Sequence, residues 1–437
     1  MKRADTGLKH IVAFNACAAR IRLLFYLSAH YNLFTMIPAK DELKVPPKWD
    51  RSGLPGWAYF SDELLELEKD ALFRRHWQLA CHVSDVPDAG DYNTFDVGEE
   101  RALIVRGHDG KVRGFHNLCR HRGSRVVAEE RGSCRGALIC PYHGWAYNLD
   151  GTLRGAAQPQ TLPDLDPVEW GLKPLDTEIW QGFIFIRFKT SDQPSVARIM
   201  GRFDAELAPY ALPDMVPVDK IQWSDETAVN WKAVRDVDNE GYHVAKAHPA
   251  LHDLYGQGYV DEPFVSGASR SFATFNPGPG SLWSVRAYKA ILPEASWLPE
   301  SHRRAWLYVA MFPNTVIGLY PDSTIFYQEF PDGVGNTKLR GAIYRRSKES
   351  REMRLARYLS GRIDAITSAE DQLLTIWSCE AAQSSAYDGI ILSDLEYGVK
   401  THHDHLRSVL PVLNLDEEPA PDTMADLNAA LLAQVCE

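Results

Sequence analysis

Hydrophobic and polar positions in the first half of the chain change from a helical to a strand-like period. Residues 61–77 place apolar side chains at helical spacing after a Ser-Asp start that suits an N-cap, so the pattern predicts one amphipathic helix. Short β-type runs follow at Tyr92–Val97, Ala102–Val105 and Val112–Phe115, separated by Gly-rich turns. We therefore predict a helix followed by a small all-β domain.

The second half of the chain mixes the two periods. Strand-like runs are predicted at Glu178–Phe188 and Asn314–Phe330. Helical patterns are predicted at Val196–Glu206, Trp231–His248 and Arg351–Glu380. This mixture, with a long helix near the C-terminus, predicts an α+β domain.

The length of the chain favours two domains, because single cores rarely grow beyond about 250–300 residues and the chain has 437. We predict a first domain at residues 40–184 and a second at 185–437. In the first 35 residues basic side chains outnumber acidic ones, and the apolar runs are too short to span a bilayer. We interpret residues 1–39 as an appended or poorly ordered N-terminal extension rather than a cleaved targeting peptide.

Composition and charge narrow the function classes. The chain is 45% hydrophobic and 24% charged, which is ordinary for a globular enzyme. Its net charge of −11 argues against binding to nucleic acid or to an anionic membrane surface, because phosphates require a basic surface. The seven cysteines form no evenly spaced framework of the kind found in disulfide-rich proteins. We therefore expect a reducing, cytoplasmic setting.

Two Cys/His pairs lie in the predicted β domain. Cys119-Arg-His121 and Cys140-Pro-Tyr-His143 each place one thiolate and one imidazole in a single loop, with residues 122–139 between the loops. A structural zinc site is the alternative, but zinc fingers use the order Cys-Cys-His-His. In a Rieske centre two cysteines bind one iron and two histidines bind the other, so one Cys and one His from each loop suit a [2Fe–2S] cluster.

The residues around these pairs resemble the Rieske domain of ring-hydroxylating and related oxygenases. The resemblance runs through residues 117–124 and 140–151 and includes the Gly-Trp and Asp-Gly steps beyond the four ligands. It implies an α+β chain in which a small all-β Rieske domain precedes a helix-grip catalytic domain. It also implies the cluster ligands, which are Cys119, His121, Cys140 and His143.

A second group of candidate ligands lies in the second domain. His243 and His248 are five residues apart on a predicted helix, where that spacing rotates the side chains by about 140°. The two rings therefore converge only if the helix is distorted or ends nearby, and Pro249 favours an ending. Two histidines with one carboxylate form the facial triad of non-haem Fe(II) oxygenases, whereas two satisfied helix histidines are the alternative.

The family resemblance extends to this segment and implies a complete iron site. Asn-Trp-Lys at 230–232, the acidic Asp236 and Glu-x-Tyr-His at 240–243 are similar to the family's catalytic string, although Val237 stands where asparagine is usual. The carboxylate ligand is implied on a late helix, where we assign Asp371 and keep Glu370 in reserve. Glu240 matches the acid that would bridge an iron-ligating histidine to a Rieske histidine of an adjoining subunit.

The implied protein is the terminal oxygenase (alpha) subunit of a multicomponent Rieske oxygenase. It would use O2, a [2Fe–2S] cluster and a mononuclear Fe(II). Electrons would come from NAD(P)H through a separate flavin/iron–sulfur reductase, with or without a ferredoxin, because no Gly-x-Gly-x-x-Gly follows a predicted strand. The resemblance further implies a homotrimer.

The substrate is open between two classes. Glutamate at position 240 is similar to the branch of choline, betaine and carnitine oxygenases, and this favours hydroxylation or N-demethylation of a quaternary ammonium compound. An aromatic cage suits such a cation, with Tyr320, Phe326 and Trp377 as candidates. The alternative is ring hydroxylation or O-demethylation of an aromatic acid. A Rieske electron-transfer protein without mononuclear iron is the alternative from another class.

Overall fold

The structure is a computed structural model that describes residues 45–435 apart from 135, 163 and 220–221. The predicted N-terminal extension, residues 1–39, lies outside the described residues. None of the described helices combines the length and the apolar character that crossing a bilayer requires.

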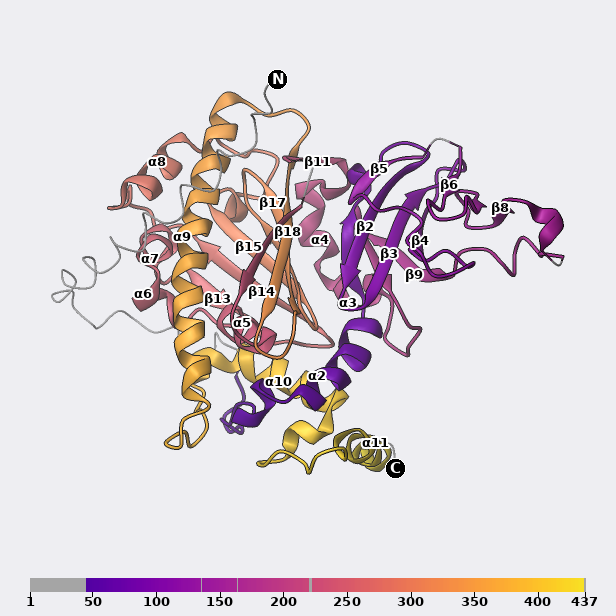
Figure 1. Cartoon of the computed structure of the whole chain (residues 1–437). Coiled ribbons are helices and arrows are strands. Elements are labelled where there is room, and N and C mark those ends of the chain that lie inside the picture. The colour runs from indigo at the N-terminus through magenta and orange to yellow at the C-terminus, as the bar shows by residue number, and fades with distance from the viewer. Residues whose placement is uncertain (1–44, 135, 163, 220–221, 436–437) are drawn as a thin grey trace, which may run out of the picture. The chain divides into compact units, whose positions relative to one another are not determined.

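Two antiparallel sheets build the predicted β domain (Figure 1). The larger sheet has the order β1-β10-β9-β4-β3-β2-β5, and the smaller sheet has the order β6-β7-β8. Their strands are β1 (Gln78–His82), β2 (Asp91–Val97), β3 (Glu100–Arg106), β4 (Val112–His116), β5 (Arg131–Ser133), β6 (Leu138–Ile139), β7 (Ala146–Tyr147), β8 (Leu153–Gly155), β9 (Pro174–Trp180) and β10 (Phe183–Arg187). In the small sheet, β6 comes just before the second Cys/His loop, and β7 and β8 follow it. This sheet therefore positions the candidate cluster ligands.

The helix predicted before this domain is present, with a change of winding. Ser61 accepts a hydrogen bond from the Leu64 backbone N–H at 3.2 Å and caps α2 (Asp62–Glu68). The chain then continues as a π-helix, η3 (Lys69–Arg74).

The single run predicted at Glu178–Phe188 is a hairpin of β9 and β10. Gln181 and Gly182 both have positive φ at its turn, a backbone state that the apolar pattern did not reveal. β10 also spans the predicted domain boundary at 184/185, and we propose that the boundary follows Arg187, where this sheet ends.

The second domain is an antiparallel sheet with helices on its faces. Its order is β11-β18-β17-β16-β15-β14-β13, and β12 also pairs with β18. The strands are β11 (Met215–Pro217), β12 (Trp223–Thr227), β13 (Tyr259–Asp261), β14 (Ala268–Thr274), β15 (Ala305–Met311), β16 (Thr315–Leu319), β17 (Thr324–Pro331) and β18 (Thr337–Arg346). The helices are α3 (Val196–Met200), α4 (Asp204–Leu207), α5 (Trp231–Asp238), α6 (Val244–Ala247), α7 (Pro249–Tyr255), α8 (Trp283–Ile291), α9 (Arg351–Ala381), α10 (Tyr397–Val409) and α11 (Met424–Val435).

The long helix predicted at Arg351–Glu380 is confirmed as α9, which ends one residue later (Figure 1). Alternation along β15 divides the core between the two faces of the sheet. Leu307 and Val309 pack in a cluster with Phe183 of the first domain, whereas Trp306 packs in a cluster that includes α9 residues such as Leu359. α9 therefore covers one face of the sheet, as the predicted helix-grip arrangement requires.

The single helix predicted at Trp231–His248 is wrong. α5 ends at Asp238, and the short helices α6 and α7 follow it on either side of His248. His248 has φ −118° and ψ 83°, outside the helical region, because a residue before proline is sterically restricted there. Pro249 then begins α7, where its missing N–H is not needed.

Candidate metal centres

The two Cys/His loops have the same backbone construction. The Gly123 N–H donates to the Cys119 carbonyl at 2.9 Å, and the Gly144 N–H donates to the Cys140 carbonyl at 3.0 Å. Both glycines have positive φ, 74° and 70°, which side chains disfavour. Each loop therefore turns back tightly after its cysteine and histidine.

The loops bury their cysteines and leave their histidines near the surface. Cys119 is 4% exposed and Cys140 is 2% exposed, whereas His121 is exposed and His143 is half-buried. The two imidazole rings lie 4.7 Å apart between centroids. A group held between these four side chains would thus have thiolates on its inner side and imidazoles toward the solvent.

Two aromatic residues support these ligands, although the sequence analysis assigned them no role. The Tyr147 hydroxyl lies 3.2 Å from Cys119 Sγ and accepts the Arg120 backbone N–H at 2.9 Å. Burial raises the pKa of Cys119, and the Tyr147 hydroxyl acts in the opposite direction. Trp145 stacks on His121 with ring centroids 5.1 Å apart. Trp145 and Tyr147 follow Cys140 closely in the chain, and this proximity was the signal in the sequence that could have identified them as supporting residues.

The donor set of the loops fits a two-iron group better than one zinc ion. Tetrahedral zinc, with bonds of about 2.0–2.3 Å, holds its ligand atoms about 3.5 Å apart. Among the described residues, the group of three donors that come within 4.8 Å of one another is His243, His248 and Asp371, and the four loop residues form no such group. Two buried thiolates that interact with each other and two imidazoles whose ring centroids are 4.7 Å apart suit a cluster in which each like pair binds its own iron.

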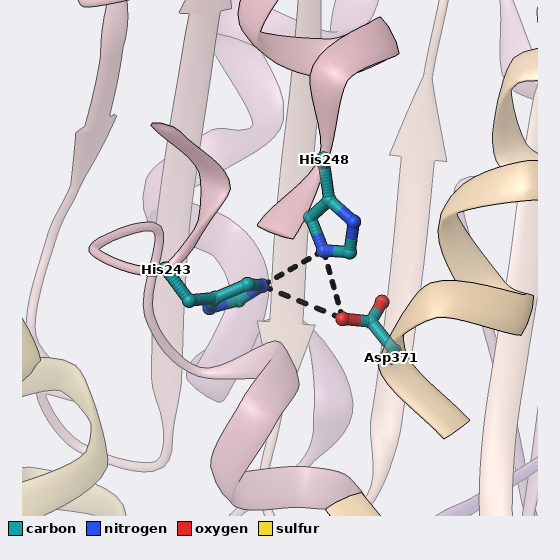
Figure 2. Close-up of side chains that lie close together, drawn as sticks. All are labelled: His243, His248 and Asp371. Carbon is teal, nitrogen blue, oxygen red and sulfur yellow. Dashed lines mark hydrogen bonds and ion pairs between the residues drawn. The ribbon is translucent and has the colours of Figure 1, made fainter. Parts of the chain in front are cut away.

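His243, His248 and Asp371 converge on one point (Figure 2). The two Nε2 atoms are 3.0 Å apart, and Asp371 Oδ1 lies 2.8 Å from His248 Nε2 and 3.4 Å from His243 Nε2. The histidines flank α6 and the aspartate comes from α9, more than 120 residues later. The break in the predicted helix brings the two imidazoles to the same side.

A carboxylate holds the far nitrogen of each imidazole. Glu240 contacts His243 Nδ1 and also accepts the His243 backbone N–H at 3.1 Å. Glu370 Oε2 lies 2.9 Å from His248 Nδ1. The structure therefore places Asp371 at the convergence point and its neighbour Glu370 at Nδ1 of the His248 ring, on the side away from that point. Such carboxylates fix the tautomer in which Nδ1 carries the proton and Nε2 presents a lone pair.

A cation would stabilise the point at which these three side chains converge. With Nδ1 protonated on both rings, two Nε2 lone pairs and the buried Asp371 Oδ1, which has no hydrogen-bond donor, face one another. Burial alone would lower the pKa of His243, but Asp371 and Glu240 outweigh it and raise this pKa to about 10. Without a metal the site would therefore take up a proton. Two imidazoles and one carboxylate on one side of a point are the ligands of non-haem Fe(II) sites.

The other residues that were singled out lie elsewhere. Asp236 accepts from the Tyr59 hydroxyl at 2.5 Å and contacts His403 Nε2 at 2.7 Å, so it braces α10 instead of facing the two iron-site histidines. Of the three aromatic candidates, Phe326 lies in the core on the opposite sheet face from Trp306, and Trp377 is 52% exposed.

Two family descriptions match separate parts of the chain. The Rieske [2Fe-2S] domain matches residues 76–166, and the ring-hydroxylating alpha subunit catalytic domain matches residues 217–411. The first range contains both Cys/His loops, and the second contains His243, His248 and Asp371.

Curated relatives include two oxygenase subunits and a choline monooxygenase. The chain is 34% identical over 198 residues to the glycine betaine monooxygenase oxygenase subunit of Pseudomonas aeruginosa, which is 45% of each chain. It is 31% identical over 230 residues to the carnitine monooxygenase oxygenase subunit of Escherichia coli K12, covering 50% of this chain and 61% of that one. It is 32% identical over 219 residues to the chloroplastic choline monooxygenase of Atriplex hortensis, covering 49% and 47%. The matched region thus spans about half the length of these relatives.

Solved structures share the fold. A quaternary ammonium Rieske monooxygenase studied for carnitine oxidation superposes with a TM-score of 0.69 at 22% identity, covering 86% of this chain and 99% of that chain. A naphthalene 1,2-dioxygenase gives a TM-score of 0.64 at 18% identity, covering 88% and 97%. With a Rieske domain and a ring-hydroxylating catalytic domain in this order and in this fold, the chain belongs to the Rieske non-haem iron oxygenases.

Proposed function

We propose that this chain is the terminal oxygenase component of a multicomponent Rieske oxygenase that hydroxylates or N-demethylates a quaternary ammonium compound. The observation that carries the proposal is the convergence of His243, His248 and Asp371 in a chain that also holds two Cys/His loops. The names of the relatives, which act on glycine betaine, carnitine and choline, favour the substrate class.

In this proposal two sets of residues hold two metal groups. Cys119, His121, Cys140 and His143 would hold the [2Fe–2S] cluster, and His243, His248 and Asp371 would hold the mononuclear iron. When bound, the cluster supplies single electrons and the iron supplies O2 activation at its open coordination positions.

The protein's own contribution is to orient these ligands. Glu240 and Glu370 keep the protons of His243 and His248 on Nδ1, so that both Nε2 lone pairs point at the same place. We propose that Glu240 also reaches a Rieske histidine of an adjoining subunit in a homotrimer. The exposure of His121 leaves one such histidine available for that contact.

The electrons require a partner in this proposal. We propose a flavin/iron–sulfur reductase, with or without a ferredoxin, that takes electrons from NAD(P)H. The sequence contains no glycine-rich dinucleotide fingerprint that would supply this step within the chain.

The test combines metal content with turnover. Purified protein should contain about three irons and two labile sulfides per chain and give a Rieske EPR signal. With a generic reductase, a panel of betaines, choline, carnitine and aromatic acids is scored for product and NADH consumption together. Product from a quaternary amine that vanishes in His243→Ala supports the proposal. Zinc in place of iron, or product from aromatic acids alone, contradicts it.

A further inference from the structure

A second acidic residue lies on the same face of α9 as the candidate iron ligand. Asp364 precedes Asp371 by seven residues, which is two helical turns or about 10 Å along the axis, so both lie on one face of α9. Protein groups surround Asp364, yet its side chain keeps accessible surface. The Asp364 side chain is therefore reachable from solvent on the face of α9 that carries Asp371.

Two tyrosines of the sheet lie on the face that α9 covers. Tyr308 packs against the cluster that contains α9 residues, and Tyr327 lies two residues after Ile325 of the same cluster on β17; both tyrosines are half-buried. Besides burial, the charge of Asp364 contributes to raising the pKa of both tyrosines, while the Tyr327 hydroxyl itself donates to Asp238 at 2.7 Å. Tyr308 pairs with Gly318 across the strands, and Ile325 of β17 packs over that glycine beside the Tyr308 ring.

A chain of hydroxyls orients the carboxylate. Tyr308 and Tyr320 hydroxyls are 3.0 Å apart, and the Tyr320 hydroxyl donates to Asp364 Oδ1 at 3.3 Å. Trp306 stacks against Tyr320 with centroids 4.1 Å apart and fixes that ring. The long contact to Tyr320 is a weak hydrogen bond for an acid held inside a protein.

Asp364 lacks the support that a structural buried acid has, and Asp322 nearby shows the contrast. Asp322 accepts from Tyr288, Ser323 and Ser360. Asp364 takes part in none of the ion pairs found among the described residues. Burial and Asp322 raise its pKa to about 8, against the weaker effect of Tyr320. An acid kept in such a place without a counter-charge is unfavourable for stability unless a cation joins it.

We propose that Asp364 and the rings of Tyr308 and Tyr327 form a subsite for an organic cation, specifically the quaternary ammonium group of the substrate. The carboxylate supplies the opposite charge, and the two rings supply cation–π contacts. The inference rests on the proposed oxygenase function and names the residues that set its substrate class.

A pH dependence follows from this arrangement. A cation binds the ionised carboxylate better than the protonated one, so its affinity should rise with pH as Asp364 ionises near pH 8. The ionisable groups that interact with Asp364 are Asp322, Tyr255, Tyr288, Tyr308, Tyr320 and Tyr327. None of them carries positive charge at these pH values.

The experiment compares choline with its uncharged carbon isostere, 3,3-dimethylbutan-1-ol. Titration calorimetry on the purified holoprotein should show that Asp364→Asn weakens choline binding at least tenfold at pH 8.5 and leaves the isostere within about twofold. The matched control is Glu352→Gln, at an exposed position in the first turn of α9, which should change neither affinity. Equal loss of both ligands in Asp364→Asn, or no loss of choline, would overturn the subsite.

The rings have their own matched pair of variants. Tyr308→Phe keeps the ring and should hold choline affinity within about threefold, whereas Tyr308→Leu should weaken it about fivefold or more. Equal choline affinities in Tyr308→Phe and Tyr308→Leu would show that the Tyr308 ring does not contribute to the subsite. Cluster absorbance and the unfolding temperature report whether each variant is folded.

Wild-type protein supplies a measurement that needs no variant. Choline affinity should increase from pH 6.5 to 8.5 while that of the isostere stays level, and a flat choline profile contradicts the subsite. Binding and turnover separate the two proposals. Tight, Asp364-dependent choline binding without oxygenated product from any quaternary amine contradicts the proposed function alone. If Asp364→Asn turns over quaternary amines as the wild type does, the subsite alone is contradicted.

Discussion

The two candidate metal centres are assembled in opposite ways. The cluster loops lie within residues 119–145, and each loop is closed by a hydrogen bond from a positive-φ glycine. The iron-site residues lie on the broken segment around α6 and on α9, in positions set by the sheet between them. The first centre depends on local turns, and the second depends on the packing of the whole catalytic domain.

Removing one ligand from each centre gives the largest expected effect. His243→Ala should lower turnover by more than about a thousandfold, because the mononuclear iron loses one of three protein ligands. Cluster absorbance should persist in this variant, and iron should fall by about one per chain. Cys119→Ser should do the reverse and remove the cluster colour. Loss of both the cluster and the mononuclear iron from either single variant would show that the centres are not independent.

Removing the carboxylate behind a ring should have a smaller effect. Glu370→Ala leaves His248 Nδ1 without its partner, and we expect iron affinity to fall about 10–100-fold. Glu370→Gln retains an acceptor and should fall between this variant and the wild type. The measurement is iron retention against a chelator at fixed pH, with the Rieske EPR signal as control. If Glu370→Ala retains iron as well as the wild type, Glu370 does not support His248 as an iron ligand.

The cluster loops should respond to backbone strain instead. Gly144→Ala places a side chain at φ 70°, which should lower the free energy of unfolding by about 1–2 kcal/mol. Gly155→Ala is the matched control, since a Cβ there meets nothing within 4 Å and Gly155 lies in strand β8. Denaturant unfolding followed by cluster absorbance measures both. Equal stability of the two variants would contradict the local origin of the loop geometry.

The smallest expected effect is the pH dependence of stability at Asp364. Burial raises its folded pKa to about 8, above the ordinary 3.8, so the folded state holds a proton that the unfolded state releases. This contribution is fully present below about pH 4 and is lost as pH rises through 8. Asp364→Asn should therefore gain stability relative to wild type at pH 9 compared with pH 5. A full shift from 3.8 to 8 would give about 4 kcal/mol between these two pH values, and we expect a gain well below that because water reaches part of the side chain. Calorimetric unfolding at the two pH values measures this gain, and a gain at pH 5 alone has the wrong sign.

Much of the molecule could be predicted from short-range patterns. The cap at Ser61, the strands β2 to β4 and the long helix α9 follow from residue types and spacing that act within a few positions. The two Cys/His loops were recognisable for the same reason, since their residues and turns are contiguous. The hairpin at Gln181 was missed because its positive φ leaves no mark on the apolar period.

The sequence alone determined which residue types were available for the second centre, and the tertiary structure decided how they are used. The helical period across 231–248 did not reveal that α5 ends at Asp238, although Pro249 favoured an ending near His248. Asp371 and Glu370 are equally good carboxylates in sequence, and the rotation of α9 against the sheet points one at the imidazole Nε2 atoms and the other at a ring's far nitrogen. The surroundings of Asp364 were also decided by the tertiary structure, because its enclosure and its lack of a counter-charge result from packing between segments far apart in the chain.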